Sequence, residues 1–167
     1  MSKICIRKGK PQDADRLVEI FENAKRYMRS YGNNSQWSHG YPSRIDILKD
    51  IELGQNYVGT DHSGEIVLSF AFIIGEEPTY LKIENGNWTN NCPYGTIHRI
   101  ASSGKFKGML NEAVKFCFSK INNIRIDTHK DNSPMITALK KLDFIHCGTI
   151  YCRDGSPRLA FQKVIII

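Results

Sequence analysis

The second half of the sequence alternates strand-like runs with amphipathic helical segments, and this alternation limits the fold more than any other feature. Residues 94–101 and 124–128 read as strands. Residues 107–121 and the segment opened by Pro134 place apolar residues on one helical face. Strands that alternate with helices in this way predict an α/β fold built on one sheet.

The remaining segments complete a mixed sheet with helices on both faces. They comprise a strand over 3–7, a helix opened by Pro11, a short helix behind the capping-box pair Ser43 and Asp46, a hairpin of 56–60 with 65–74, a long polar loop over 75–93, and a last hairpin of 144–151 with 158–164. The predicted order is β-α-α-β-β-β-α-β-α-β-β. We expect residues 1–167 to form a single domain.

Composition and charge limit the cellular compartment and the class of partner that we expect. The formal charge of +6 suggests an anionic partner, either nucleic acid or a phosphate-bearing small molecule, and the basic residues are spread instead of forming a run. Five cysteines form no C-x-x-C pair, which favours free thiols in a reducing compartment. No apolar run approaches membrane-spanning length, and the N-terminus does not resemble a signal peptide. We therefore expect a soluble, cytoplasmic protein.

No metal site is expected from the sequence. Asp127, His129 and Asp131 carry ligand-type side chains, but their spacing is short and no further cluster accompanies them. That pattern is more typical of a solvated strand end than of a metal centre.

The segment most informative about function runs from Ile97 to Leu110, a strand that leads through a basic loop into a helix. A helix N-terminus presents unpaired N–H groups and the positive end of its dipole to an anion. Gly108 lets the backbone approach a phosphate closely because no Cβ intervenes, and Lys105 and Lys107 add positive charge. The alternative is a basic loop that only caps the helix. A P-loop and a dinucleotide fold are disfavoured, since neither motif is present.

The element order and this loop together resemble the GNAT superfamily of N-acetyltransferases over essentially the whole chain. The family motif Gln/Arg-x-x-Gly-x-Gly/Ala has its counterpart in Lys105-Phe106-Lys107-Gly108-Met109-Leu110, with leucine where a small residue is usual. A second motif, Asn-x-x-Ala-x-x-Leu-Tyr-x-Lys-x-Gly-Phe, has its counterpart in residues 132–144. Within it Asn132, Lys141 and Phe144 match, whereas Leu139 replaces the tyrosine and Asp143 the glycine.

The resemblance implies acetyl-CoA as cosubstrate and the residues that hold it. The pyrophosphate of coenzyme A would rest on backbone N–H groups of the loop and first helical turn, contributed by Lys105, Phe106, Lys107, Gly108, Met109 and Leu110. The pantetheine arm would lie along the strand edge at His98, Ile100 and Ala101. Asn132 would help to hold the arm from the far side.

The strand that precedes the loop carries our candidate general base. Alternation places Tyr94, Thr96, His98 and Ile100 on one face. Histidine is the side-chain type that can act as a base near neutral pH, so His98 is the candidate base, acting directly or through water. A structural hydrogen bond is the alternative role for this histidine.

Two further side chains complete the candidate chemistry. Leu139 cannot donate a proton, so Tyr151 is the candidate acid for the departing thiolate, with solvent as the alternative. Arg99 and Asp127, on strands expected to be neighbours, are predicted to form a structural pair.

The sequence thus predicts an acetyl-CoA-dependent N-acetyltransferase. The acetyl group would pass to a primary amine of a small molecule or peptide by direct attack in a ternary complex. A non-catalytic acyl-CoA-binding module is the alternative, favoured by Leu110 and Leu139, and a nucleic-acid-binding domain is favoured only by the charge. The expected partners are the amine acceptor and, as one option, a second copy in a homodimer, with neither nucleic acid nor membrane.

Overall fold

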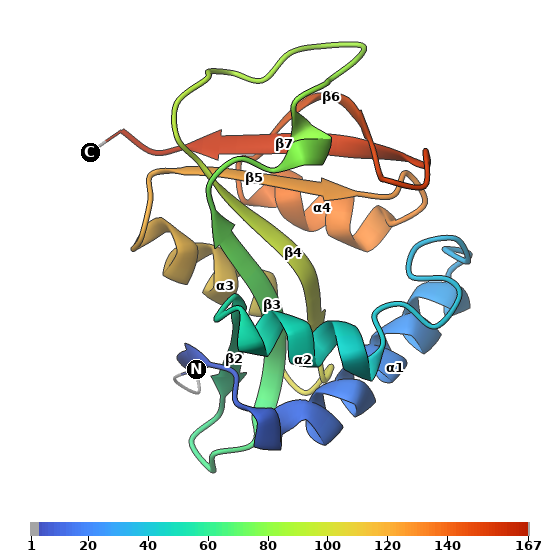
Figure 1. The fold of residues 1–167 in the computed structure, drawn as a ribbon, viewed down its shortest axis with the longest axis vertical. Helices are drawn as coiled ribbons and strands as arrows, with labels where there is room; N and C mark the ends of the chain where they lie inside the picture. Colours follow the sequence, from blue (N-terminus) through green and yellow to red (C-terminus); the bar gives the residue numbers. More distant parts are fainter. Residues whose placement is uncertain (1–3, 167) are drawn as a thin grey trace. The chain divides into compact units, whose positions relative to one another are not determined.

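Seven strands form one mixed sheet in the order β1-β2-β3-β4-β5-β7-β6 (Figure 1). The computed structural model describes residues 4–166; Lys3, at the start of the predicted first strand, lies outside them. The strands are β1 (Cys5–Lys8), β2 (Asn56–Thr60), β3 (Ile66–Ile74), β4 (Gly95–Ser102), β5 (Asn123–Thr128), β6 (Ile145–Tyr151) and β7 (Pro157–Val164). The helices are α1 (Ala14–Ser30), α2 (Arg44–Glu52), α3 (Met109–Phe118) and α4 (Ser133–Lys141), with 3-10 turns η1 (Pro11–Asp13) and η2 (Pro78–Tyr80). This order confirms the predicted α/β fold.

The chain divides into two compact units. The first contains the residues up to Phe72 together with His98–Phe116, and the second contains Ile73–Ile97 together with the residues from Cys117 onward. β3, β4 and α3 each contribute residues to both units. Within residues 4–166, no helix has the length and apolar character that a membrane crossing requires.

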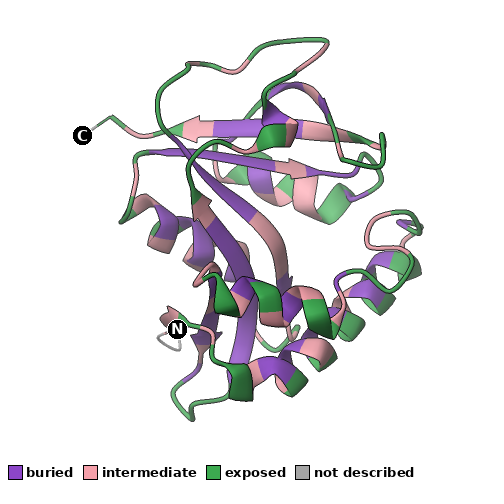
Figure 2. Cartoon of the chain, in the orientation of Figure 1, coloured by how far each residue is buried: buried purple, intermediate pink, exposed green. Residues whose placement is uncertain are grey.

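In the first unit, helices cover both faces of the strands. Tyr57 and Val58 are consecutive on β2, so their side chains point to opposite faces. Val58 belongs to a cluster with α1 and α2, formed by Leu17, Ile20, Phe21, Ile47, Val58, Ile66 and Ala101. Tyr57 packs against Phe70 and against Phe116 of α3, with ring centroids 5.7 and 5.0 Å apart. β3 is therefore buried on both sides, as its colour in Figure 2 shows.

The ends of α1 and α2 follow from local sequence. Pro11 opens a 3-10 turn ahead of α1, where its missing N–H costs nothing. At the start of α2, Asp46 N donates to Ser43 Oγ, and Ser43 N donates to the Asp46 carboxylate over 2.7 Å. This reciprocal pair is the predicted capping box.

In the second unit, the segment between β3 and β4 is fastened to one face of β5. Asn123, Arg125 and Asp127 alternate along β5 and so share that face. Asn123 Nδ2 donates to Asn90 Oδ1 (3.0 Å), Arg125 Nη2 to Asn90 O (2.7 Å) and Tyr80 Oη to Asp127 Oδ1 (2.6 Å). In Figure 1, α4 lies behind β5 and the loop runs in front of it. The polar face of β5 is thus covered by the loop between β3 and β4 and not by a helix.

The same loop also reaches the outer strand of the sheet. Glu84 and Thr149 exchange two backbone hydrogen bonds of 2.8 Å, an isolated antiparallel bridge on β6. The bridge occupies backbone groups that an edge strand would otherwise leave open.

The C-terminus of α4 ends in a Schellman motif centred on Asp143. Phe144 N donates to Leu139 O and Asp143 N to Lys140 O, both over 3.0 Å. Asp143 has φ of +58°, the left-handed conformation for which the resembled motif uses glycine. Leu139 and Phe144 are both buried, which supplies the apolar contact usual in this motif.

Replacing Asp143 by glycine is expected to raise the free energy of unfolding by about 1 kcal/mol, because glycine takes a positive φ without a Cβ penalty. Asp143→Ala should lower it, since alanine lacks the short polar side chain that tolerates this region. The Asp143–Lys163 pair should contribute little, because its atoms are 3.8 Å apart and the Asp143 side chain is 88% exposed. Chemical denaturation of the three proteins checks the order, and equal stabilities for the glycine and alanine variants would contradict it.

Candidate active site

The loop that precedes α3 has two left-handed positions, Gly104 with φ of +80° and Gly108 with φ of +79°. A Cβ built at either would meet no atom of the described residues within 4 Å. The need for glycine therefore comes from the backbone conformation, and the space beside both residues is open. α3 begins at Met109, two residues later than the sequence predicted, because Gly108 lies outside the helical region.

Gly108 directly precedes α3 and accepts a hydrogen bond from its first turn. Its carbonyl accepts a hydrogen bond from Glu112 N over 3.2 Å. The N–H groups of the first turn, beginning with Met109 and Leu110, belong to the end of the helix dipole that attracts anions. Met109 is buried and Leu110 half-buried, so neither side chain is fully exposed at this end.

The two lysines of the loop are not equivalent. Lys105 Nζ lies 2.8 Å from Asp61 Oδ2 and 2.6 Å from Glu65 Oε2. Lys107 is exposed and, among the described residues, has no ion pair or hydrogen bond of its side chain. From the sequence, we expected both lysines to supply positive charge to a phosphate. In the structure the ammonium of Lys105 is paired with Asp61 and Glu65.

β4 is irregular at the candidate base. Arg99 has φ of +49°, so the strict alternation on which the sequence argument relied is interrupted directly after His98. Thr96 is buried, whereas His98 and Ile100 are half-buried. The predicted alternation of side chains therefore does not extend to Ile100. The left-handed conformation of Arg99 interrupts the regular strand between His98 and Ile100.

Arg99 is held by α2 and by the loop that joins α1 to α2. Its Nε and Nη2 donate to the two carboxylate oxygens of Asp50 over 2.7 and 2.8 Å, and its Nη1 donates to Tyr41 Oη over 2.9 Å. The sequence predicted Asp127 as the partner of Arg99, and this prediction is wrong. In the structure the partners of Arg99 are Asp50 and Tyr41. In the same loop, Trp37 packs edge-on against Phe21 at 5.4 Å and covers the core.

The candidate acid lies in the second unit, at the end of β6. Tyr151 Oη donates to Glu84 Oε2 over 3.0 Å, and Lys82 Nζ lies 2.7 Å from the other oxygen of Glu84. The hydrogen bond to the Glu84 carboxylate raises the pKa of Tyr151. A raised pKa makes this hydroxyl a weaker acid.

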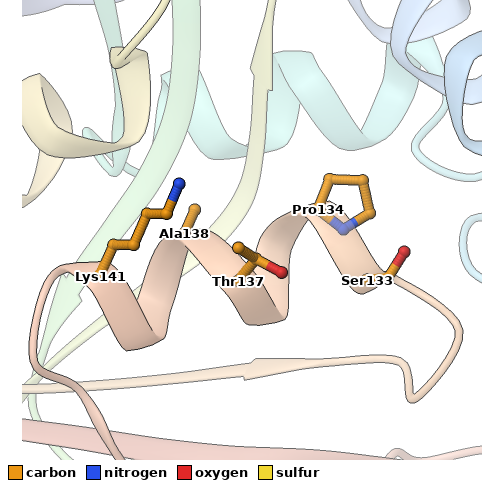
Figure 3. A pocket seen from close by; sticks show the side chains of 5 residues that line it. All are labelled: Ser133, Pro134, Thr137, Ala138 and Lys141. Carbon is orange, nitrogen blue, oxygen red and sulfur yellow. The ribbon is translucent and has the colours of Figure 1, made fainter.

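Asn132 and a pocket on α4 form a second candidate binding surface. Asn132 is buried at the N-cap of α4, where its Oδ1 accepts from Met135 N over 3.3 Å. The pocket, about 340 Å³, is lined by Ser133, Pro134, Thr137, Ala138 and Lys141. Figure 3 shows Pro134, Ala138 and Lys141 projecting from the same side of the helix. The sequence did not predict this pocket; small side chains three to four residues apart on the helix were the available signal for it.

Leu139 occupies the motif position where the resembled family has tyrosine. Its side chain is completely buried. It therefore packs in the core of the second unit and offers no hydroxyl.

Similar solved structures identify the class to which this fold belongs. A GNAT-family acetyltransferase from Streptococcus agalactiae 2603 shares 34% identity with a TM-score of 0.88, and the match covers 98% of this chain and 96% of that one. A GNAT-family acetyltransferase from Listeria monocytogenes 4b F2365 has 18% identity and a TM-score of 0.70, with 97% and 95% covered. An N-acetyltransferase from Staphylococcus aureus Mu50 has 17% identity and a TM-score of 0.58, with 98% and 99% covered.

No family model and no curated protein matches the chain. The two more distant structures share its fold, which is that of acetyltransferases. The Streptococcus structure is similar enough in sequence, over nearly the full length of both chains, to show the family. The chain belongs to the GNAT family of acetyltransferases.

Asp50→Asn is expected to lower the free energy of unfolding by about 2 kcal/mol, because it replaces a charge-assisted bidentate partner of a mostly buried guanidinium. The Arg99 and Asp50 side chains are only 19% and 12% exposed. Arg44→Gln, which breaks the exposed pair with Asp15, is the matched control and should change stability by less than about 0.5 kcal/mol. Urea denaturation measures both, and similar losses in the two variants would contradict the assignment.

Proposed function

We propose that the chain is an acetyl-CoA-dependent N-acetyltransferase that acts on a primary amine of a small molecule or peptide. The observation that carries the proposal is the loop ahead of α3, which stands at the position of the family motif and leads from Gly108 into a helix N-terminus. Membership of a family whose solved members are acetyltransferases supports the same activity. The amine would attack directly, in a ternary complex.

The loop residues fit the pyrophosphate of coenzyme A. Open space beside Gly104 and Gly108 leaves the backbone accessible, and Lys107 supplies an exposed cation. We assign the contacts to backbone N–H groups from Lys105 to Leu110. His98, Ile100 and Ala101 keep the strand-edge contacts that the family resemblance gives them, and Asn132 keeps its contact with the pantetheine arm.

Acetyl-CoA supplies an activated thioester, so the acid–base steps are removal of a proton from the acceptor amine and return of a proton to the departing thiolate. His98 would take the extra proton from the acceptor amine, directly or through water. Protonation of the leaving thiolate by solvent is better supported than donation by Tyr151, because the hydrogen bond to Glu84 weakens that hydroxyl as an acid. The five free cysteines fit a reducing cytoplasm as the setting.

A non-catalytic acyl-CoA-binding module is the second candidate. The burial of Leu139 at the family's tyrosine position favours it. An assay of thiol release over a panel of amines separates the two functions, since a module binds coenzyme A without turnover.

Acetyl-CoA is expected to raise the melting temperature, and the stabilisation should grow with ligand concentration, reaching about 2.7 kcal/mol at a hundredfold excess over Kd. Pantetheine, which lacks the pyrophosphate, should stabilise less at equal concentration. Thermal unfolding with increasing ligand measures the effect. No shift at millimolar acetyl-CoA would remove both candidate functions.

His98→Ala is expected to lower turnover roughly 10²-fold with little change in acetyl-CoA affinity, because a base acts on the proton and not on cosubstrate binding. The acidic limb of the pH–rate profile should flatten, since that limb reports protonation of the base. His62→Ala, at an exposed histidine of the β2–β3 turn, is the control. Steady-state kinetics with the acceptor decide the matter, and near wild-type turnover in His98→Ala would return the histidine to a structural role.

A further inference from the structure

An ion-pair network in the first unit joins the loop before α3 to the β2–β3 turn and to α1. Lys105 Nζ lies within 2.8 Å of both Asp61 and Glu65. Arg16 of α1 continues the network, with its Nη2 3.0 Å from Glu65 Oε1. Arg16 also lies 2.9 Å from Glu19 of α1, so two cations face three carboxylates and the network carries a net negative charge.

Asp61 is a fixed anchor within this network. Its side chain is fully buried, and its Oδ1 accepts from Ser63 N (2.9 Å), Ser63 Oγ (2.6 Å) and Glu65 N (3.1 Å). The other oxygen is left for Lys105. Hydrogen bonds from Lys105 and Ser63 hold the pKa of Asp61 well below its usual range, so the carboxylate stays ionised.

Lys105 lies in a loop segment bounded by two glycines with left-handed backbone. Its ion pairs attach this segment to the β2–β3 turn. Ser103 N donates to Val67 O of β3 over 2.9 Å, which fixes the start of the loop. Gly104 and Gly108 then flank the three residues that end at Lys107. Glycine at both ends gives this stretch conformational freedom, so it needs a side-chain contact to hold one conformation.

The position of Lys105 is unfavourable for a phosphate ligand. To reach a phosphate, its ammonium would have to leave two carboxylates at charge-assisted distances. The phosphate would also come close to those carboxylates, and like charges repel. Neither cost applies to Lys107, whose side chain has no carboxylate partner among the described residues.

We propose that Lys105 is a positioning residue: through Asp61 and Glu65 it holds the loop in the conformation that binds coenzyme A, while Lys107 supplies the charge for the phosphates. This inference rests on the proposed function, because the conformation of the loop matters only if coenzyme A binds there. It assigns an indirect role to a residue that the motif alone presents as a direct ligand.

The sign of one substitution separates positioning from direct binding. Asp61→Asn keeps an oxygen for the turn but removes the charge that holds Lys105. If Lys105 bound phosphate, this change would release it and remove a nearby negative charge, so coenzyme A should bind more tightly. If Lys105 positions the loop, affinity should fall by about tenfold, a typical coupling within one ion-pair network. Titration calorimetry with coenzyme A measures the change.

Further variants extend the test, and those at Lys105 alone leave the β2–β3 turn unaltered. Glu65→Gln, at a more exposed carboxylate, should also weaken binding. Lys105→Gln should weaken it, Lys105→Arg should restore it, and the double variant Lys105→Gln with Asp61→Asn should be no weaker than either single one. Lys115→Gln, which breaks the exposed pair with Glu112 on α3, is the matched control and should bind as wild type.

A readout without ligand completes the test. Amide hydrogen exchange over residues 103–108 of the free protein should accelerate in Asp61→Asn and Lys105→Gln but not in Lys115→Gln. Tighter binding of coenzyme A by Asp61→Asn or Glu65→Gln, or unchanged exchange in the loop, would overturn the inference while leaving the proposed function intact. A wild-type protein that does not bind coenzyme A would remove both.

Discussion

Burial of β3 on both faces is the constraint on which the rest of the first unit depends. One face meets α1 and α2 through the cluster around Leu17 and Ile47, and the other meets α3 through Phe70 and Phe116. A strand packed on both sides has little freedom to shift, because protein interiors are close-packed. The start of the loop ahead of α3 is fixed to this strand, since Ser103 N bonds to Val67 O. The candidate binding loop is therefore attached to the most buried strand of its unit.

The second unit solves the same packing problem with polar contacts. β5 presents Asn123, Arg125 and Asp127 to a loop instead of presenting apolar side chains to a helix. The Arg125 guanidinium lies against two aromatic rings, 4.2 Å from the Trp88 ring centre and 4.0 Å from that of Tyr94. Flat rings suit a weakly hydrated planar cation, which helps to offset the cost of burying it. A long segment whose regular structure is limited to the short turn η2 and one β-bridge can thus be ordered by side-chain contacts.

The sequence predicted the elements well because their signals are local. The capping box at Ser43, the helix start at Pro11 and the hairpin of β2 with β3 each depend on residues a few positions apart. Left-handed backbone at Arg99 has no such signal, because arginine does not normally favour that region. Asp143 could have been foreseen, since it replaces a glycine in the resembled motif.

The candidate site was predicted as a set of residues but not as a set of contacts. Lys105 was placed in the right loop, yet its partner Asp61 lies 44 positions away in the chain. The partner of Arg99 is similarly distant, 49 positions away on α2. Charge and spacing in one sequence do not reveal which opposite charges meet after folding, and that pairing decides whether a lysine is available to a ligand.

The bridge between Glu84 and Thr149 has a consequence for assembly. A second copy that tried to continue the sheet from the outer side of β6 would find the backbone groups of Thr149 already taken by the chain's own loop. Such a copy would have to displace the residues around Glu84, and with them the hydrogen bond from Tyr151. Any homodimer formed by joining sheets at this strand would therefore start with the loss of an intramolecular strand pair, which makes side-chain packing on another surface the less costly route to association.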